Sequence, residues 1–176
     1  GEPIYGDKDI VDLEKMKQFG LPFWLAGSYE HPEQLKQARD AGAVGIQVGT
    51  AFSLCDESGM ETELKKQVLQ QAILQNVQVF TSPDASPTGF PFKIAQVPNT
   101  MSELEVYNAR KRICDVSLLR TLFKDSEGVI NYRCAAEPVE DYLSKGGKVE
   151  DTVGRTCLCN NLIATAGFPQ RRKDGY

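Results

Sequence analysis

The apolar positions in the first part of the chain follow two different periods. Short continuous apolar runs occur at residues 21–26 and 44–48. Between them, residues 32–42 open on proline, close on glycine and carry apolar side chains at helical spacing. The pattern predicts a buried strand, a helix and a second strand. So short a connection favours a parallel, right-handed βα unit.

Further helices are predicted on both sides of this unit. Residues 9–19 place apolar side chains three or four positions apart and are followed by Gly20, which can end a helix. Residues 61–75 repeat apolar positions four apart, and residues 77–81 can form one more strand. Alternating helices and strands of this kind are typical of an α/β fold.

The pattern changes after residue 81. Residues 82–91 hold three prolines and a glycine, which predicts a loop rich in turns. Beyond it, short helices are predicted at 102–111, 118–123, 138–143 and 158–166, with one strand at 129–133. We therefore expect two parts: α/β units at 1–81, and a loop with a mostly helical extension at 82–176.

Composition and charge narrow the classes of function. A net charge of −4 argues against binding to nucleic acids or membrane surfaces, because both need a positive field. No stretch approaches the roughly 20 apolar residues of a membrane span, and no signal peptide is recognised, so we expect a cytoplasmic protein. Five cysteines, an odd number, favour reduced thiols or a metal over a disulfide framework. The acidic residues at 137–141 are interpreted as a solvated helix start.

The strongest indication of a binding site comes from two turns, Gly27-Ser28 and Gly49-Thr50, which follow the two predicted strands. Both would lie at the carboxyl edge of a parallel sheet, where α/β folds bind ligands. Glycine lets backbone amides approach an anion closely, and the adjacent hydroxyls add donors. The pattern indicates a phosphate site, although turns that only reverse the chain direction look the same.

The stretch LPFWLAGSY, continued by GAVGIQVGTAFSLCDESG, resembles the last two strand–turn units of the nitronate monooxygenase (2-nitropropane dioxygenase-like) family. Barrels of that family are similar to flavin-dependent enoyl reductases. An Ala-Gly-Gly turn and a Gln-x-Gly-Thr turn hold the FMN phosphate there, and Ser28 stands here where a second glycine is usual. The resemblance therefore implies these cofactor-binding residues: Ala26, Gly27, Ser28, Gln47, Val48, Gly49 and Thr50.

The later stretches SPTGFPFK, YRCAAEP and GRTCLCNN resemble the carboxyl-terminal extension of a longer branch of the same family. The resemblance implies the carboxyl-terminal fragment of a (β/α)8, TIM-type barrel, namely its last two βα units, followed by a mostly helical extension. A closed barrel takes about 250 residues. We therefore expect the missing amino-terminal half of the barrel to be a partner.

In that family the catalytic residues lie before the matched stretch, so no catalytic residue is assigned here. His31, the sole histidine, follows the first turn and fits helix capping or solvent exposure better than catalysis. We expect the chain alone to be inactive. The parent enzyme would act on a small molecule, either a nitronate or an enoyl thioester.

Four cysteines fall in the second half of the chain: Cys114, Cys134, Cys157 and Cys159. Four thiolates can hold zinc or an iron–sulfur cluster, but Cys-Leu-Cys is not the usual Cys-x-x-Cys pair, so we favour structural thiols. Two other classes of function stay open. One is a non-catalytic phosphate-binding or assembly module that pairs through exposed strand edges with the missing half or with itself as a homo-oligomer. The other is an interaction domain stapled by a metal.

Overall fold

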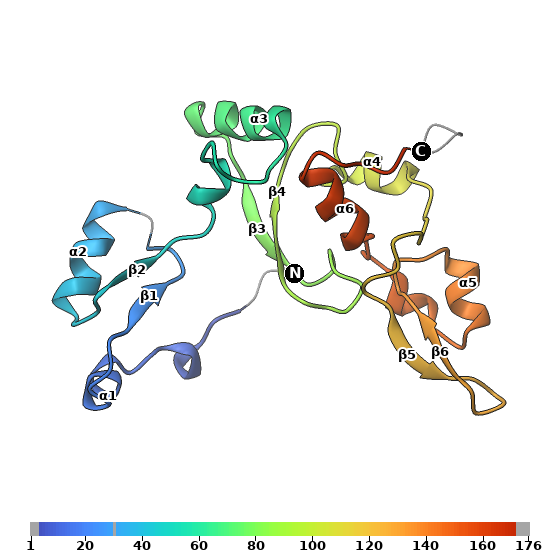
Figure 1. Ribbon diagram of the computed structural model, residues 1–176, viewed down its shortest axis with the longest axis horizontal. Coiled ribbons are helices and arrows are strands. Elements are labelled where there is room, and N and C mark those ends of the chain that lie inside the picture. Colours follow the sequence, from blue (N-terminus) through green and yellow to red (C-terminus); the bar gives the residue numbers. More distant parts are fainter. Residues whose placement is uncertain (1–3, 30, 172–176) are drawn as a thin grey trace. The chain divides into compact units, whose positions relative to one another are not determined.

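The computed structural model describes residues 4–29 and 31–171 (Figure 1). It is a mixed α/β structure with small two-stranded sheets and, in this part of the chain, no closed barrel. Two compact units are present: the amino-terminal unit, Ile4–Gly59, and the carboxyl-terminal unit, which begins at Met60. The expected division between residues 81 and 82 stays a prediction. None of the helices described is long and apolar enough to span a membrane.

The amino-terminal unit contains the expected strand, helix and strand. Its elements are the 3₁₀ turn η1 (Asp7–Asp9), α1 (Leu13–Gln18), β1 (Trp24–Ala26), α2 (Pro32–Asp40), β2 (Gly45–Gln47) and the 3₁₀ turn η2 (Ala51–Leu54). β1 and β2 pair in parallel, with Trp24 opposite Gly45 and Ala26 opposite Gln47. The predicted parallel βα unit is confirmed at this level.

Local signals explain where these helices begin and end. Asp12 accepts the amide of Lys15 at 3.0 Å and so caps α1, whereas the earlier Asp9 accepts the amide of Gly6 at 2.8 Å within the separate turn η1. α2 opens with Pro32 in its first turn, and the chain leaves it through Gly42, whose φ is +92°. A side chain at φ > 0 is strained, so glycine suits this exit.

The prediction of a buried first strand is wrong for this structure. The side chains of Leu21 and Trp24 are 71% and 56% exposed. β1 has a single neighbour, β2, and a two-stranded parallel sheet cannot enclose both of its faces. The apolar run would suit a strand buried on both faces. In the described unit, however, no further strand or helix covers these side chains.

The carboxyl-terminal unit is built from short helices and two antiparallel hairpins (Figure 1). In chain order these are α3 (Thr62–Ile73), β3 (Val79–Ser82), β4 (Phe92–Ala95), α4 (Leu104–Ala109), β5 (Thr121–Lys124), β6 (Ile130–Arg133), α5 (Val139–Ser144), the 3₁₀ turn η3 (Val149–Thr152) and α6 (Leu158–Thr165). Helices α3 to α6 and strands β3 and β6 lie where the sequence pattern predicted them. Strand β4 was not predicted.

The predicted helix at 118–123 is wrong, because residues 121–124 form strand β5. Asp125 accepts the amides of Glu127 and Val129 at 3.0 and 2.9 Å, which closes a tight turn through Gly128. This turn pairs β5 with β6 in antiparallel register. The apolar spacing at 118–123 fits a helix equally well, and the hairpin turn decides between the two.

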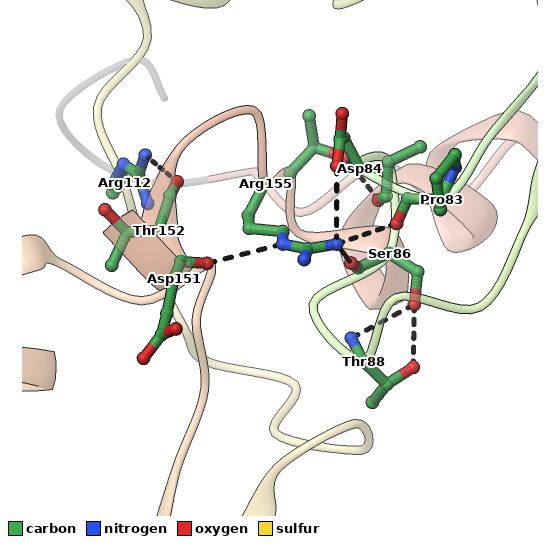
Figure 2. Close-up of polar contacts among 10 residues, drawn as sticks. Pro83, Asp84, Ser86, Thr88, Arg112, Asp151, Thr152 and Arg155 are labelled. Carbon is green, nitrogen blue, oxygen red and sulfur yellow. Dashed lines mark hydrogen bonds and ion pairs between the residues drawn. The ribbon is translucent and has the colours of Figure 1, made fainter. Parts of the chain in front are cut away.

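The loop between β3 and β4 is held by side chains rather than by a neighbouring strand (Figure 2). One nitrogen of Arg155, Nη1, donates to the carbonyls of Pro83 and Ser86 at 2.7 and 2.9 Å. The hydroxyl of Thr156 donates to the carbonyl of Ala85 at 2.8 Å. Ser86 is only 1% exposed, so its carbonyl needs an internal partner.

Other arginines of this unit also donate hydrogen bonds to backbone carbonyls in loops. The bonds run from Arg110 to Arg155 O (3.0 Å), from Arg112 to Ala135 O (3.2 Å) and Thr152 O (2.8 Å), and from Arg133 to Lys145 O (2.9 Å). Each of these bonds joins segments that lie apart in sequence. Long-range bonds from side chain to backbone therefore hold together loops that the two separate hairpins leave unpaired.

We expect Arg155→Ala to lower the free energy of unfolding by about 2–4 kcal/mol, because it removes the charge-assisted hydrogen bonds to the carbonyls of Pro83 and Ser86. Urea unfolding measures the loss, and hydrogen exchange of the β3 and β4 amides locates it. The control is Lys66→Ala, which removes a surface ion pair with Glu63 whose side chains are 66% and 67% exposed. That substitution should cause no measurable change. Equal effects of the two substitutions would contradict the role given to Arg155.

Candidate functional site

The pairing of β1 with β2 brings the two predicted phosphate turns to the same edge. Ala26 and Gln47, the last residues of the two strands, lie directly opposite each other. Because the strands are parallel, the turns Gly27-Ser28 and Gly49-Thr50 both leave from the carboxyl end of the pair. Val48 joins Gln47 to the second turn. The structure thus places Ala26 opposite Gln47, and the other five residues that the sequence singled out for cofactor binding follow these two strand ends in the chain.

The first turn has a left-handed backbone at two successive residues. The φ angle is +84° at Gly27 and +58° at Ser28. Glycine adopts such angles freely, but a residue with a Cβ adopts them seldom and at a cost in free energy. Non-glycine residues in this region are found disproportionately at ligand and active sites. Ser28 is therefore consistent with a functional turn.

Space and donors are available beside both turns. Among the described residues, apart from the immediate chain neighbours, no atom lies within 4 Å of the position that a Cβ would occupy at Gly27 or Gly49. Within the described residues, the hydroxyls of Ser28 and Thr50 form no hydrogen bond with another protein group. An anion could therefore reach the backbone here and meet two hydroxyl donors.

Each turn is followed by helical structure. η2 begins directly after Thr50, and α2 begins at Pro32 after its N-cap residue His31. His31 is exposed; its backbone amide donates to Oε1 of Gln34 at 2.9 Å, and its imidazole makes no capping hydrogen bond. The amino end of α2 carries a partial positive charge that favours anions nearby.

The late cysteines occupy a different, more buried environment. None of the five cysteines is in a disulfide, and Cys134 and Cys159 are buried. Burial raises the pKa of the Cys134 thiol to about 11, with the neighbouring Cys114 and Cys157 adding to the effect. Across the described ranges, no three Cys, His, Asp or Glu side chains are placed to hold a metal ion.

One acidic residue lies in an environment that the sequence pattern did not indicate. Glu137, interpreted as part of a solvated helix start, is only 4% exposed, so that interpretation is wrong. Its Oε2 accepts from Nζ of Lys145 at 2.8 Å. Lys145 lies eight positions after Glu137, a spacing wider than the three or four positions of an ion pair on one helix face, so the sequence did not predict this ion pair. Helix α5, which lies between the two residues, brings them together.

Comparisons of the chain with protein-family models, with curated proteins and with solved structures found no match. The resemblance to nitronate monooxygenases therefore stays a prediction drawn from the motifs themselves. The assignment of the two turns rests on those motifs and on the geometry described above.

The two glycines should respond differently to alanine. We expect Gly27→Ala to destabilise the amino-terminal unit by about 1–2 kcal/mol, because its φ of +84° strains a side chain. Gly49→Ala should cause no loss, since its φ lies outside the strained region and its Cβ would meet no protein atom within 4 Å. Thermal unfolding followed by the fluorescence of Trp24, the sole tryptophan, measures both. Equal losses would show that the turn geometry is not as described.

The raised pKa of Cys134 predicts a loss of stability at high pH. From the ordinary value of 9.0 to the folded value of about 11, the unfolded chain releases the proton while the folded chain keeps it. The free energy of unfolding should therefore fall as pH rises through this window, by on the order of 2 kcal/mol. Urea unfolding of the unsubstituted chain and of Cys134→Ala, from pH 8 to 11, isolates this contribution. Parallel profiles of the two proteins would contradict it.

Proposed function

We propose that this chain is part of an FMN-dependent oxidoreductase resembling nitronate monooxygenases, and that it supplies the turns that bind the FMN phosphate. The observation that carries this proposal is the parallel, in-register pairing of β1 and β2. That pairing puts Ala26 opposite Gln47, so both turns leave from the same end of the strand pair, and both glycines have open space beside them. Neighbouring backbone turns without Cβ atoms suit a phosphate, which needs several amide donors at close range.

The residues of the two turns have distinct roles in this proposal. Gly27 and Gly49 let the backbone approach the phosphate, while Ser28 and Thr50 donate from their hydroxyls. Ser28 replaces a glycine of the family pattern, and its left-handed backbone keeps the turn in the conformation that a glycine would adopt. The bound FMN would supply redox chemistry toward a nitronate or an enoyl thioester. No residue of this chain is assigned to catalysis, and the chain alone is expected to be inactive.

Exposed apolar side chains support a missing partner for the amino-terminal unit. Leu21, Trp24 and Phe52 are 71%, 56% and 67% exposed, although all three lie in or beside the strands and turns of the proposed site. The preceding half of a barrel would cover this surface and continue the sheet at its open edge. The same surface also fits self-association, the second candidate function. Reduced cysteines agree with a cytoplasmic location.

The proposal is tested by FMN binding to a polypeptide that carries this chain together with the preceding barrel half. We expect a flavin absorbance spectrum from the purified protein. Gly49→Val should weaken FMN binding by about tenfold or more, because it displaces the phosphate from a charge-assisted hydrogen bond. Fluorescence titration with FMN measures the dissociation constant.

Gly59→Val is the matched control. Gly59 also has no protein atom within 4 Å of a Cβ and no strained φ, but it lies outside both turns, so its replacement should leave FMN affinity unchanged. Absence of flavin from the longer polypeptide, or unchanged affinity in Gly49→Val, would count against the proposal. Size-exclusion chromatography of the chain alone tests self-association: a monomer at micromolar concentration argues against the second candidate.

A further inference from the structure

A cavity of about 420 Å³ lies in the carboxyl-terminal unit, away from the glycine turns in sequence. It is lined by residues from 111–120 and from 137–145. Its size falls within the range of small-molecule sites. The charged lining residues are four basic ones, Lys111, Arg112, Arg120 and Lys145, and two acidic ones, Glu137 and Asp141. The basic excess stands out in a chain whose net charge is −4.

Arg112 is a half-buried cation without an acidic partner. Its two Nη atoms donate to the carbonyls of Ala135 at 3.2 Å and Thr152 at 2.8 Å, and among the described residues no carboxylate pairs with it. Burial and the nearby charge of Arg110 lower the pKa of this guanidinium. Arginine nevertheless stays protonated at neutral pH. An anion in the cavity would offset the cost of holding this charge away from water.

Arg120 is also without a carboxylate partner in the described part of the chain. Its Nε donates to the carbonyl of Ser117 at 3.2 Å, and its guanidinium lies 4.8 Å from the centre of the Tyr132 ring. These contacts orient the side chain and use one N–H group, at Nε, as a donor. The N–H groups of the two Nη atoms are available to a ligand.

The acidic residues do not cancel this charge. Glu137 is paired with Lys145 through Oε2 at 2.8 Å, while its buried Oε1 has no hydrogen-bond partner among the described residues. Asp141 is exposed. The lining has two more basic than acidic residues, so its net formal charge is positive.

We propose that this cavity binds the oxyanion of a small organic molecule, a phosphate monoester or a carboxylate, through Arg112 and Arg120. Guanidinium groups bind both oxyanions through paired hydrogen bonds, which a lysine cannot reproduce. Ile113 and Pro138 also line the cavity and offer an apolar wall to the organic part of the ligand. The site is separate from the FMN turns and does not depend on the function proposed for them.

Isothermal titration of the full chain at constant ionic strength tests the proposal, with glycerol 2-phosphate as the phosphate ester and succinate as the carboxylate. We expect one of the two to bind with one-to-one stoichiometry. Arg120→Gln should weaken binding about tenfold or more, the effect of losing a charge-assisted hydrogen bond. Arg112→Gln should also weaken binding; because it releases two loop carbonyls, Arg120→Gln decides the question if the Arg112 variant does not fold.

Two control variants separate this site from other sources of binding. Lys124→Gln removes a positive charge from β5 outside the cavity and should leave affinity unchanged. Gly49→Val tests whether the phosphate ester binds instead at the turns proposed for the FMN phosphate. The proposal is overturned if neither compound binds, if Arg120→Gln binds as tightly as the unsubstituted chain, or if Lys124→Gln weakens binding as much. Loss of binding in Gly49→Val would assign the ligand to the glycine turns and equally overturn it.

Discussion

The carboxyl-terminal unit depends on hydrogen-bond donors for the backbone carbonyls of the β3–β4 loop, whose central residues, 85–87, are buried. The β3–β4 loop has no neighbouring strand, and its prolines cannot donate, yet Ser86 at its centre is 1% exposed. Arg155 donates hydrogen bonds to the carbonyls of Pro83 and Ser86 (Figure 2). The hydroxyl of Thr156 donates to the carbonyl of Ala85. Since both donors come from one short segment before α6, that segment and the loop near the middle of the chain are joined by hydrogen bonds.

Helices and strands were predictable from the sequence where the residues that determine them lie close together in the chain. The βα unit is an example, because the apolar runs, Pro32 and Gly42 all fall within one short stretch. Residues 118–123 show the opposite case: their spacing fits a helix, but the turn at Asp125 pairs them with β6. A short apolar run is ambiguous between helix and strand until its partner is known.

Burial was less predictable than secondary structure, because it depends on what lies opposite. Trp24 belongs to an apolar run and is nevertheless exposed, since β1 has one neighbour only. Glu137 belongs to an acidic run and is nevertheless buried, since Lys145 returns to pair with it. The same reasoning explains why the cavity at Arg112 and Arg120 had no signal in the sequence: residues far apart in the chain form it.

The candidate phosphate site was accessible from sequence for a specific reason. A site made of backbone at two strand ends needs only the glycines and the parallel register, and both are set within one βα unit. The left-handed conformation of Ser28 was not accessible, because serine seldom adopts it. The edge that we propose to bind phosphate therefore forms from two strands alone. Under that proposal, the groups that face the flavin ring would come from strands other than β1 and β2.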